Sequence, residues 1–191
     1  MNADVIGMLA KRRTIRRYTD ERVPEETIAA LLEAAFYAPS YLNRRPAHFL
    51  VVEDKEVQQR LGAILSVRPY VQQASAVIVL LADPELSPVW PADLAAAAEN
   101  ILIAASALGL GAAWVGNPFG AAWEMREAEI RELLGIPDHI RTLGLITVGH
   151  PADHPEPHTK ASSWDSLRVH YGSFAGFRPE WANLNAGKPP Q

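Results

Sequence analysis

The sequence predicts an α+β fold, with layers of helices around a central sheet, from three features. Helical patterns alternate along the chain with short apolar strand patterns, and the helices outnumber the strands. Of the 191 residues, 48% are hydrophobic and 21% are charged, which is typical of a folded domain. After Gly149 the composition changes to proline, histidine and serine. We therefore expect one domain over residues 1–151, and a tail over residues 152–191 that packs on the domain or on a partner subunit.

Apolar residues repeat at helical spacing in several segments. The clearest stripe belongs to a helix that opens at Pro24 and Glu25 and stops at Pro39. Asp54 is expected to cap the helix that follows it. Further helices are expected over residues 3–11, 55–65, 91–108 and 127–134.

The longest expected helix, residues 91–108, is rich in alanine and nearly uncharged after Glu99. A helix that is apolar around most of its circumference must be buried on most sides, in the core or against another subunit. We favour a subunit interface, which predicts a homodimer.

Short apolar and β-branched runs predict the strands of the sheet. Residues 76–82 form the most apolar run, so they are expected in the centre of the sheet with both faces buried. Further strands are expected over residues 49–52, 112–115 and 143–148.

Charge and cysteine content exclude several classes of function. The net charge is −4, so the chain has no overall positive field for nucleic acid or an anionic membrane. The absence of cysteine excludes disulfides and thiolate chemistry, and the six histidines have no metal-site spacing. The N-terminus lacks the charge order of a secretion signal and no apolar run could span a bilayer, so the cytoplasm is the expected location.

A basic cluster at the end of the first expected helix is a candidate phosphate site. Five basic residues fall among positions 11–17. Arg12, Arg13 and Arg16 match phosphate oxygens because a guanidinium donates two parallel hydrogen bonds, and Thr14 adds a hydroxyl. The alternative, which this pattern alone favours, is a solvated charge run.

A polar loop with Ser40 and Asn43 is the second candidate. These side chains offer the donors and acceptors that the polar edge of a flavin requires. The same residues also form good turns and caps, so the loop alone is weak evidence of binding.

The glycines of residues 109–116 do not form a dinucleotide-binding fingerprint. They follow a helix and precede a strand, and the third glycine is absent. Gly109 is expected to end the helix, whereas Gly116, at the end of a strand, would let a ligand approach the backbone. Hydrolase motifs are also missing from the sequence.

In this order, the motifs resemble the nitroreductase family of FMN-dependent oxidoreductases. The resemblance covers about residues 4–151 and depends on the ordered combination, since no single segment is specific. The matching segments are residues 12–18, 23–24, 32–35, 38–40 with Asn43, Phe49, residues 93–100, 108–111, 114–116, 134–137 and 149–151.

This resemblance implies a mixed central sheet flanked by helices, in an intertwined homodimer with FMN in two pockets at the subunit interface. Arg12 and Thr14 would face the phosphate and ribityl chain, Arg16 the pyrimidine end, and Lys160 would complete the phosphate site. Pro39, Ser40 and Asn43 would come from the other subunit. Val115 and Gly116, at the end of the third expected strand, would lie beside the reactive edge of the flavin. The residues expected to hold FMN are thus Arg12, Arg13, Thr14, Arg16, Pro39, Ser40, Asn43, Val115, Gly116 and Lys160.

The implied reaction is the reduction of a small electron-poor acceptor, such as a nitroaromatic or a quinone, with NAD(P)H as the reductant. The two would use one pocket in turn, in a ping-pong mechanism, and the flavin would carry the chemistry, so no catalytic side chain is named. Tyr41, Phe119 and Trp123 are expected over the exposed flavin face. Core packing is an equal alternative for Phe119 and Trp123.

Two other functions stay open on the sequence. One is a flavin-binding sensor or carrier without turnover. The other is a specialised relative that performs reductive dehalogenation or fragments the flavin, although the short stretch of residues 65–90 argues against the extended lid that such enzymes use.

Overall fold

The computed structural model describes residues 4–66, 68–116 and 121–176. The chain divides into two compact units. The described residues of the range 12–155 form the larger unit, whereas those of the ranges 1–11 and 156–191 form the smaller one. The first boundary between the units therefore falls at the start of the arginine cluster.

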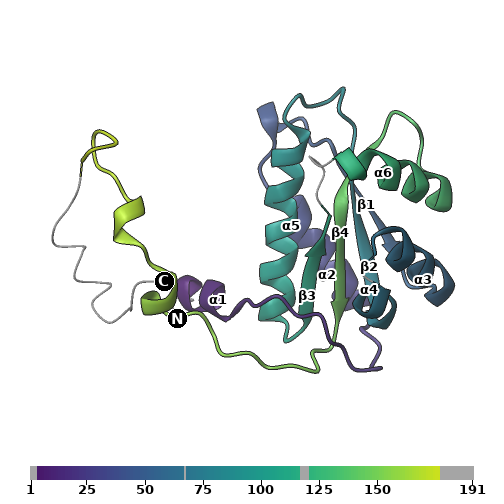
Figure 1. Cartoon of the computed structure of the whole chain (residues 1–191), viewed down its shortest axis with the longest axis horizontal. Helices are drawn as coiled ribbons and strands as arrows, with labels where there is room; N and C mark the ends of the chain where they lie inside the picture. Colours follow the sequence, from purple (N-terminus) through teal and green to yellow (C-terminus); the bar gives the residue numbers. More distant parts are fainter. Residues whose placement is uncertain (1–3, 67, 117–120, 177–191) are drawn as a thin grey trace. The chain divides into compact units, whose positions relative to one another are not determined.

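A 4-stranded sheet forms the centre of the larger unit (Figure 1). Its strands are β1 (Ala47–Val52), β2 (Ala76–Ala82), β3 (Gly111–Val115) and β4 (Arg141–Gly149), in the spatial order β1-β2-β4-β3. The strand pairs are antiparallel, and an isolated bridge between Thr14 and Ala112 adds a parallel pairing at β3. With helices on this sheet, the predicted α+β class is confirmed.

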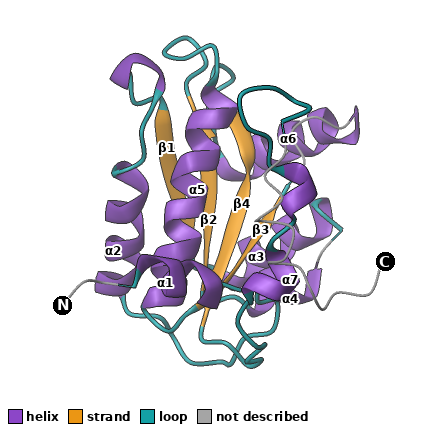
Figure 2. Ribbon diagram, turned by 90° about the vertical axis from the view of Figure 1, so that its left-hand side faces the viewer, coloured by secondary structure: helices purple, strands orange, loops and turns teal. Residues whose placement is uncertain are grey.

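The helices of the larger unit cover both faces of the sheet. They are α2 (Glu25–Phe36), α3 (Lys55–Ile64), α4 (Arg68–Gln73), α5 (Trp90–Ala107) and α6 (Ala121–Leu134), with a 3₁₀ turn at Tyr41–Asn43. One apolar cluster lies between the sheet and α2 and α5, and a second between the sheet and α3, α4 and α6. Figure 2 shows α2 and α5 in front of the strands.

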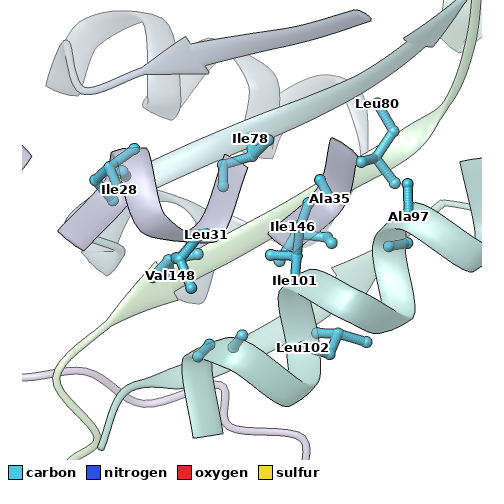
Figure 3. Packing of buried hydrophobic residues seen from close by; sticks show 14 of the residues in the cluster. Ile28, Leu31, Ala35, Ile78, Leu80, Ala97, Ile101, Leu102, Ile146 and Val148 are labelled. Atoms are coloured by element: carbon cyan, nitrogen blue, oxygen red, sulfur yellow. The ribbon is translucent and has the colours of Figure 1, made fainter. Parts of the chain in front are cut away.

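Burial on both faces explains the uninterrupted apolar sequence of β2. Ile78 and Leu80 belong to the cluster under α2 and α5, whereas Val77 and Val79 belong to the cluster on the other face. Figure 3 shows Ile78 and Leu80 among side chains of α2, α5 and β4. The predicted central strand is confirmed.

Local sequence signals predicted some helix boundaries correctly but not others. The Asp54 carboxylate accepts hydrogen bonds at 2.9 Å from two amides in the first turn of α3, which confirms the predicted cap. Helix α6 begins at Ala121, earlier than the predicted start at Glu127, because the charged residues Glu124 and Arg126 in its first turns obscure the apolar repeat. Helix α4 was not predicted, since six residues with Pro69 in the first turn are too few to show a period.

Both ends of the chain contribute to the smaller unit. It contains α1 (Val5–Lys11), α7 (Lys160–Ser163) and a 3₁₀ turn at Ser166–Arg168. The His158 amide donates to the Ala10 carbonyl at 2.8 Å and so joins the two segments. None of the residues of α1 is buried.

The part of the chain that the structure describes contains neither a membrane-spanning helix nor a cluster of metal ligands. None of its helices combines the length and the apolar composition needed to cross a membrane. It also contains no group of three acidic or histidine side chains that could hold a metal ion.

Candidate functional site

The arginine segment, residues 12–16, is fixed against β3. The Ile15 amide donates to the Ala112 carbonyl at 3.0 Å, and Thr14 forms the parallel bridge with the same residue. Ile15 is buried, whereas Thr14 and Arg16 on either side of it are exposed. This alternation is expected of an extended segment, and it leaves the hydroxyl and the guanidinium accessible to a ligand.

Tyr18 anchors the chain just after this segment. Its hydroxyl donates to the Ile15 carbonyl at 2.7 Å and lies 2.7 Å from the Thr147 Oγ1. Burial raises the Tyr18 pKa far above its ordinary value, so the phenol keeps its proton and remains a donor. A hydrogen bond from the Thr19 amide to the His150 carbonyl, at 2.9 Å, continues the attachment beside β4.

The three arginines have different surroundings. Arg12 is half-buried, and its Nε lies 3.3 Å from the Glu99 Oε1 of α5. Arg16 is exposed, with its Cζ 5.9 Å from the centre of the Tyr70 ring, in cation–π range. Arg13 is partly buried. The segment therefore presents positive charge in partly ordered side chains, as a phosphate site requires.

The second predicted group, residues 39–45, forms a tight loop with an irregular backbone. Leu42, Asn43 and Arg45 have positive φ angles of 47°, 55° and 50°, which non-glycine residues rarely adopt. The Ser40 Oγ accepts from the Arg45 amide at 3.0 Å, and the Asn43 Oδ1 accepts from the Arg45 Nε at 3.2 Å. These bonds leave the Ser40 O–H and the Asn43 NH₂ as donors for another partner.

Asp93 of α5 holds this loop in place. Its Oδ1 accepts from the Tyr41 amide at 2.9 Å. Asp93 is only 8% exposed, and within the described residues its Oδ2 is buried without a hydrogen-bond partner. A cavity of about 170 Å³ beside it is also lined by Pro39, Ser40 and Arg45. A buried acceptor without a donor is costly, so this side of the loop retains an unmet hydrogen bond.

Val115 and Gly116 lie where β3 ends in a close backbone approach. Gly116 has a φ of 138°, and a Cβ there would lie 2.8 Å from the Gly144 Cα. Gly144 has a φ of 150°, and a Cβ there would collide with the Val115 carbonyl oxygen. Both positions thus require glycine. Gly116 is exposed, so a ligand can reach the backbone at this point.

The aromatic residues predicted over the flavin face have different environments. Trp123 is 3% exposed and its Nε1 donates to the Thr142 carbonyl at 3.1 Å, so it packs in the core on the inner face of α6. This finding favours the core-packing alternative over a pocket-lining role for Trp123. Tyr41 is exposed, with the Arg44 Cζ 6.0 Å from its ring centre. Phe119 lies outside the described residues.

Lys160 belongs to the smaller unit, whereas the arginine segment belongs to the larger one. It is the first residue of α7, is exposed, and places its Nζ 5.6 Å from the centre of the Trp164 ring. Thr159 and Ser162 form a capping box at this helix end. The expected contact between Lys160 and a phosphate stays a prediction.

Helix α5 supports both predicted groups of the larger unit. Glu99 contacts Arg12, and Asp93 contacts the backbone of Tyr41. At ~1.5 Å rise per residue, the Cα atoms of the two residues are separated by roughly 9 Å along the helix axis. The arginine segment and the polar loop therefore depend on the same rigid element.

A family model described as the nitroreductase family matches residues 9–83 and 68–150. These matches cover the arginine segment, the polar loop and the end of β3. The chain belongs to the nitroreductase family. The family predicted from the sequence is thereby confirmed.

Relatives of this nitroreductase-family chain carry related names. An Archaeoglobus fulgidus protein provisionally named NADH dehydrogenase/NAD(P)H nitroreductase is 37% identical over 171 residues, which cover 87% of this chain and 97% of the relative. The NAD(P)H FMN reductase of Bacillus subtilis is 29% identical over 171 residues, 78% of this chain and 67% of the relative. The structure of an FMN-dependent nitroreductase from Clostridium difficile matches with a TM-score of 0.83 and 32% identity, over 89% of this chain and 100% of that chain.

The sequence of this nitroreductase-family chain did not reveal the carboxylates that support the site. Asp93 lies in the first turn of α5, where an acidic residue suits the helix dipole and needs no other explanation. Glu99 resembles an ordinary solvated charge. Their position on an otherwise uncharged helix was the signal that could have identified them, since such a helix has little other reason to carry acidic side chains.

Proposed function

We propose that this chain is an FMN-dependent oxidoreductase that takes electrons from NAD(P)H and reduces small electron-poor acceptors, such as nitroaromatics or quinones. Membership of the nitroreductase family supports this function. The names of the Bacillus subtilis FMN reductase and of the Clostridium difficile FMN-dependent nitroreductase also support FMN as the cofactor.

The observation that carries the proposal is the fixed arginine segment. The Arg12 guanidinium and the Thr14 hydroxyl supply donors of the kind that phosphate oxygens accept, and Arg16 adds a second cation. The hydrogen bond between Ile15 and Ala112 fixes the backbone of the segment, which reduces the entropy cost of binding. The chemistry of these donors therefore fits the phosphate end of FMN.

When bound, FMN supplies hydride transfer through its isoalloxazine ring. Arg16 contributes a positive charge that stabilises negative charge developing on a ligand beside it. Gly116 lacks a side chain, so the backbone at the end of β3 can approach the edge of a planar ligand. These contributions orient the ligand and stabilise charge without a side chain that transfers protons.

The polar loop contributes recognition and the place where acceptors bind. The Ser40 and Asn43 donors suit the polar edge of a flavin held mainly by the other subunit, and Asp93 keeps the loop in position. The exposed ring of Tyr41 offers a flat apolar surface to an aromatic acceptor. NAD(P)H and the acceptor occupy this surface in turn, which gives ping-pong kinetics.

Two apolar surfaces support the homodimer. In the smaller unit, α1 leaves Val5, Ile6, Met8 and Leu9 exposed. In the larger unit, the alanine-rich outer side of α5 is partly exposed at Ala92, Ala95 and Ala96. Exposed apolar surface of this kind marks protein interfaces. A second copy of the chain covers both in the proposed assembly.

Absorption spectroscopy of the purified protein tests the proposed function. We expect a flavin spectrum with close to one FMN per chain after heat release and identification of the chromophore. NADH or NADPH added without oxygen should bleach this spectrum, and a quinone or nitroaromatic should restore it. Initial rates at several fixed acceptor concentrations should give parallel double-reciprocal lines.

Other outcomes separate the alternatives. A colourless protein that fails to bind added FMN contradicts the proposed function. A protein that binds FMN but oxidises neither NADH nor NADPH with any acceptor is a flavin carrier or sensor, the second function that the sequence left open.

A further inference from the structure

The contact between Arg12 and Glu99 uses one edge of the guanidinium. The Arg12 Nε lies 3.3 Å from the Glu99 Oε1, with 26% and 49% of the two side chains exposed. A guanidinium has five N–H donors in a planar fork, and the two terminal nitrogens carry four of them. A carboxylate beside Nε therefore restricts the orientation of the guanidinium, and the terminal nitrogens keep donors for another acceptor.

Glu99 is attached to a rigid support. It lies in the middle of the 18-residue helix α5. The neighbouring Asn100 donates from its Nδ2 to the Ala34 carbonyl of α2 at 2.9 Å, and Ala98 and Ile101 are buried in the core. The Glu99 backbone is therefore fixed relative to the sheet, so its carboxylate can restrict a longer and more flexible partner.

Arg12 needs such a restriction more than the other residues of its segment. It is the first residue of the larger unit, directly after the end of α1, and the backbone bond of Ile15 to β3 comes three residues later. An arginine side chain has many rotamers, and ordering them on binding weakens the affinity for a ligand. The contact with Glu99 selects an orientation before the ligand arrives.

We propose that Glu99 is a positioning residue that presents the terminal nitrogens of Arg12 to the phosphate of the flavin, and that it thereby makes the protein select FMN over riboflavin. This inference rests on the proposed function. Glu99 acts through Arg12, so it affects only the phosphate part of the ligand. Ligands that lack the phosphate should bind with the same affinity whether or not Arg12 is oriented.

Glu99 has two opposite effects on phosphate binding. Its negative charge weakens binding, whereas its contact with Arg12 strengthens it. A carboxylate near a phosphate repels it, whereas the contact of the Glu99 oxygen with the Arg12 Nε orders the arginine. Glutamine keeps an oxygen of the same reach and removes the charge. Glu99→Gln should therefore bind FMN at least as tightly as the natural protein, whereas Glu99→Ala should bind it more weakly.

Titration of the apoprotein with FMN and with riboflavin, followed by flavin fluorescence, tests this role. Immobilising one flexible side chain on binding predicts that Glu99→Ala raises the Kd for FMN about three- to tenfold, with the Kd for riboflavin unchanged. Glu129→Ala is a matched control, because it removes an exposed carboxylate from α6 on the other face of the sheet. It should alter neither Kd.

Each contrary result identifies a different failure. Equal weakening of FMN and riboflavin by Glu99→Ala would mean a general structural role, and unchanged or tighter FMN binding would mean that Glu99 does not position Arg12. Loss of FMN affinity in Glu99→Gln equal to that in Glu99→Ala would also overturn the inference. If the natural protein binds neither flavin, the proposed function fails before Glu99 is tested.

Discussion

Glu127 and Arg141 join α6 to β4 through an ion pair with a buried carboxylate and a partly exposed guanidinium. The Glu127 carboxylate accepts from the Arg141 Nε at 2.9 Å, from its Nη2 at 2.8 Å and from the Thr142 amide at 2.7 Å. Burial by itself raises the Glu127 pKa, but the hydrogen bonds from Arg141 and Thr142 outweigh it, and the pKa lies below its ordinary value. The pair therefore stabilises the fold only while the carboxylate is charged.

Removing either partner should have unequal effects. Arg141→Ala leaves Glu127 buried without its counter-charge and should lower the free energy of unfolding by about 3–5 kcal/mol. Glu127→Gln leaves a partly solvated arginine and should cost less, about 1–2 kcal/mol. Urea denaturation measures both. Equal effects of the two substitutions would contradict the buried-carboxylate account.

The pH dependence of the same pair has a definite sign. A carboxyl group with a lowered pKa in the folded state stabilises the protein above the pKa of the unfolded chain, roughly 4.3, and this stabilisation is lost as the pH falls. The stability gap between the natural protein and Glu127→Gln should therefore stay constant from neutral pH to about pH 5 and shrink below it. A gap that widens in acid would contradict the assignment.

Single residues were predictable where their role is local. Asp54 caps α3 through amides only two and three positions away, so the sequence contains both partners. Asp93 and Glu99 act on Tyr41 and Arg12, far away in the sequence, and no local pattern reveals such pairs. The burial of Trp123 was not predictable either. It depends on the early start of α6 at Ala121, which the sequence pattern did not reveal.

At the scale of elements, the end of β3 meets β4 at Gly144 in a contact that only glycines allow. Gly144→Ala adds a Cβ against the Val115 carbonyl oxygen at a positive φ, and should destabilise the fold by roughly 2–5 kcal/mol. Gly109→Ala is the matched control: its φ is also positive, at 77°, but no atom lies within 4 Å of the added carbon. Gly109→Ala should lower the free energy of unfolding by about 1–2 kcal/mol, from backbone strain alone. Similar losses in thermal denaturation would show that packing at Gly144 contributes little.

Element prediction succeeded where burial imposed a pattern on the sequence. β2 had to be apolar at each position because both of its faces are covered, and its predicted and observed bounds coincide. The strand order was not predictable, because antiparallel neighbours separated by long stretches of chain leave no periodic signal. The prediction missed helix α4 and the start of α6 for the opposite reason. A short helix or a charged first turn shows no stripe of apolar residues at helical spacing.

At the scale of the whole molecule, the exposed side chains of α1 provide a test of the proposed homodimer. Ile6 is 75% exposed in the single chain, so Ile6→Asp should leave the fold of one chain intact. In the proposed dimer it places a charge in an apolar interface, so light scattering should show a shift to monomer, with loss of bound FMN. Met125→Asp, at an exposed position on α6, should remain dimeric. An unchanged dimer in Ile6→Asp would exclude α1 from the interface.

The strand order also determines when the sheet can form during synthesis. β4 occupies the position between β2 and β3, although it follows both of them in the sequence. As the chain leaves the ribosome, β2 and β3 are complete while the place between them is still empty, and each exposes an unpaired edge. Residues 141–149 close this gap, so a nascent chain that stalls before them presents the apolar β2 edge to chaperones and to other unfinished chains.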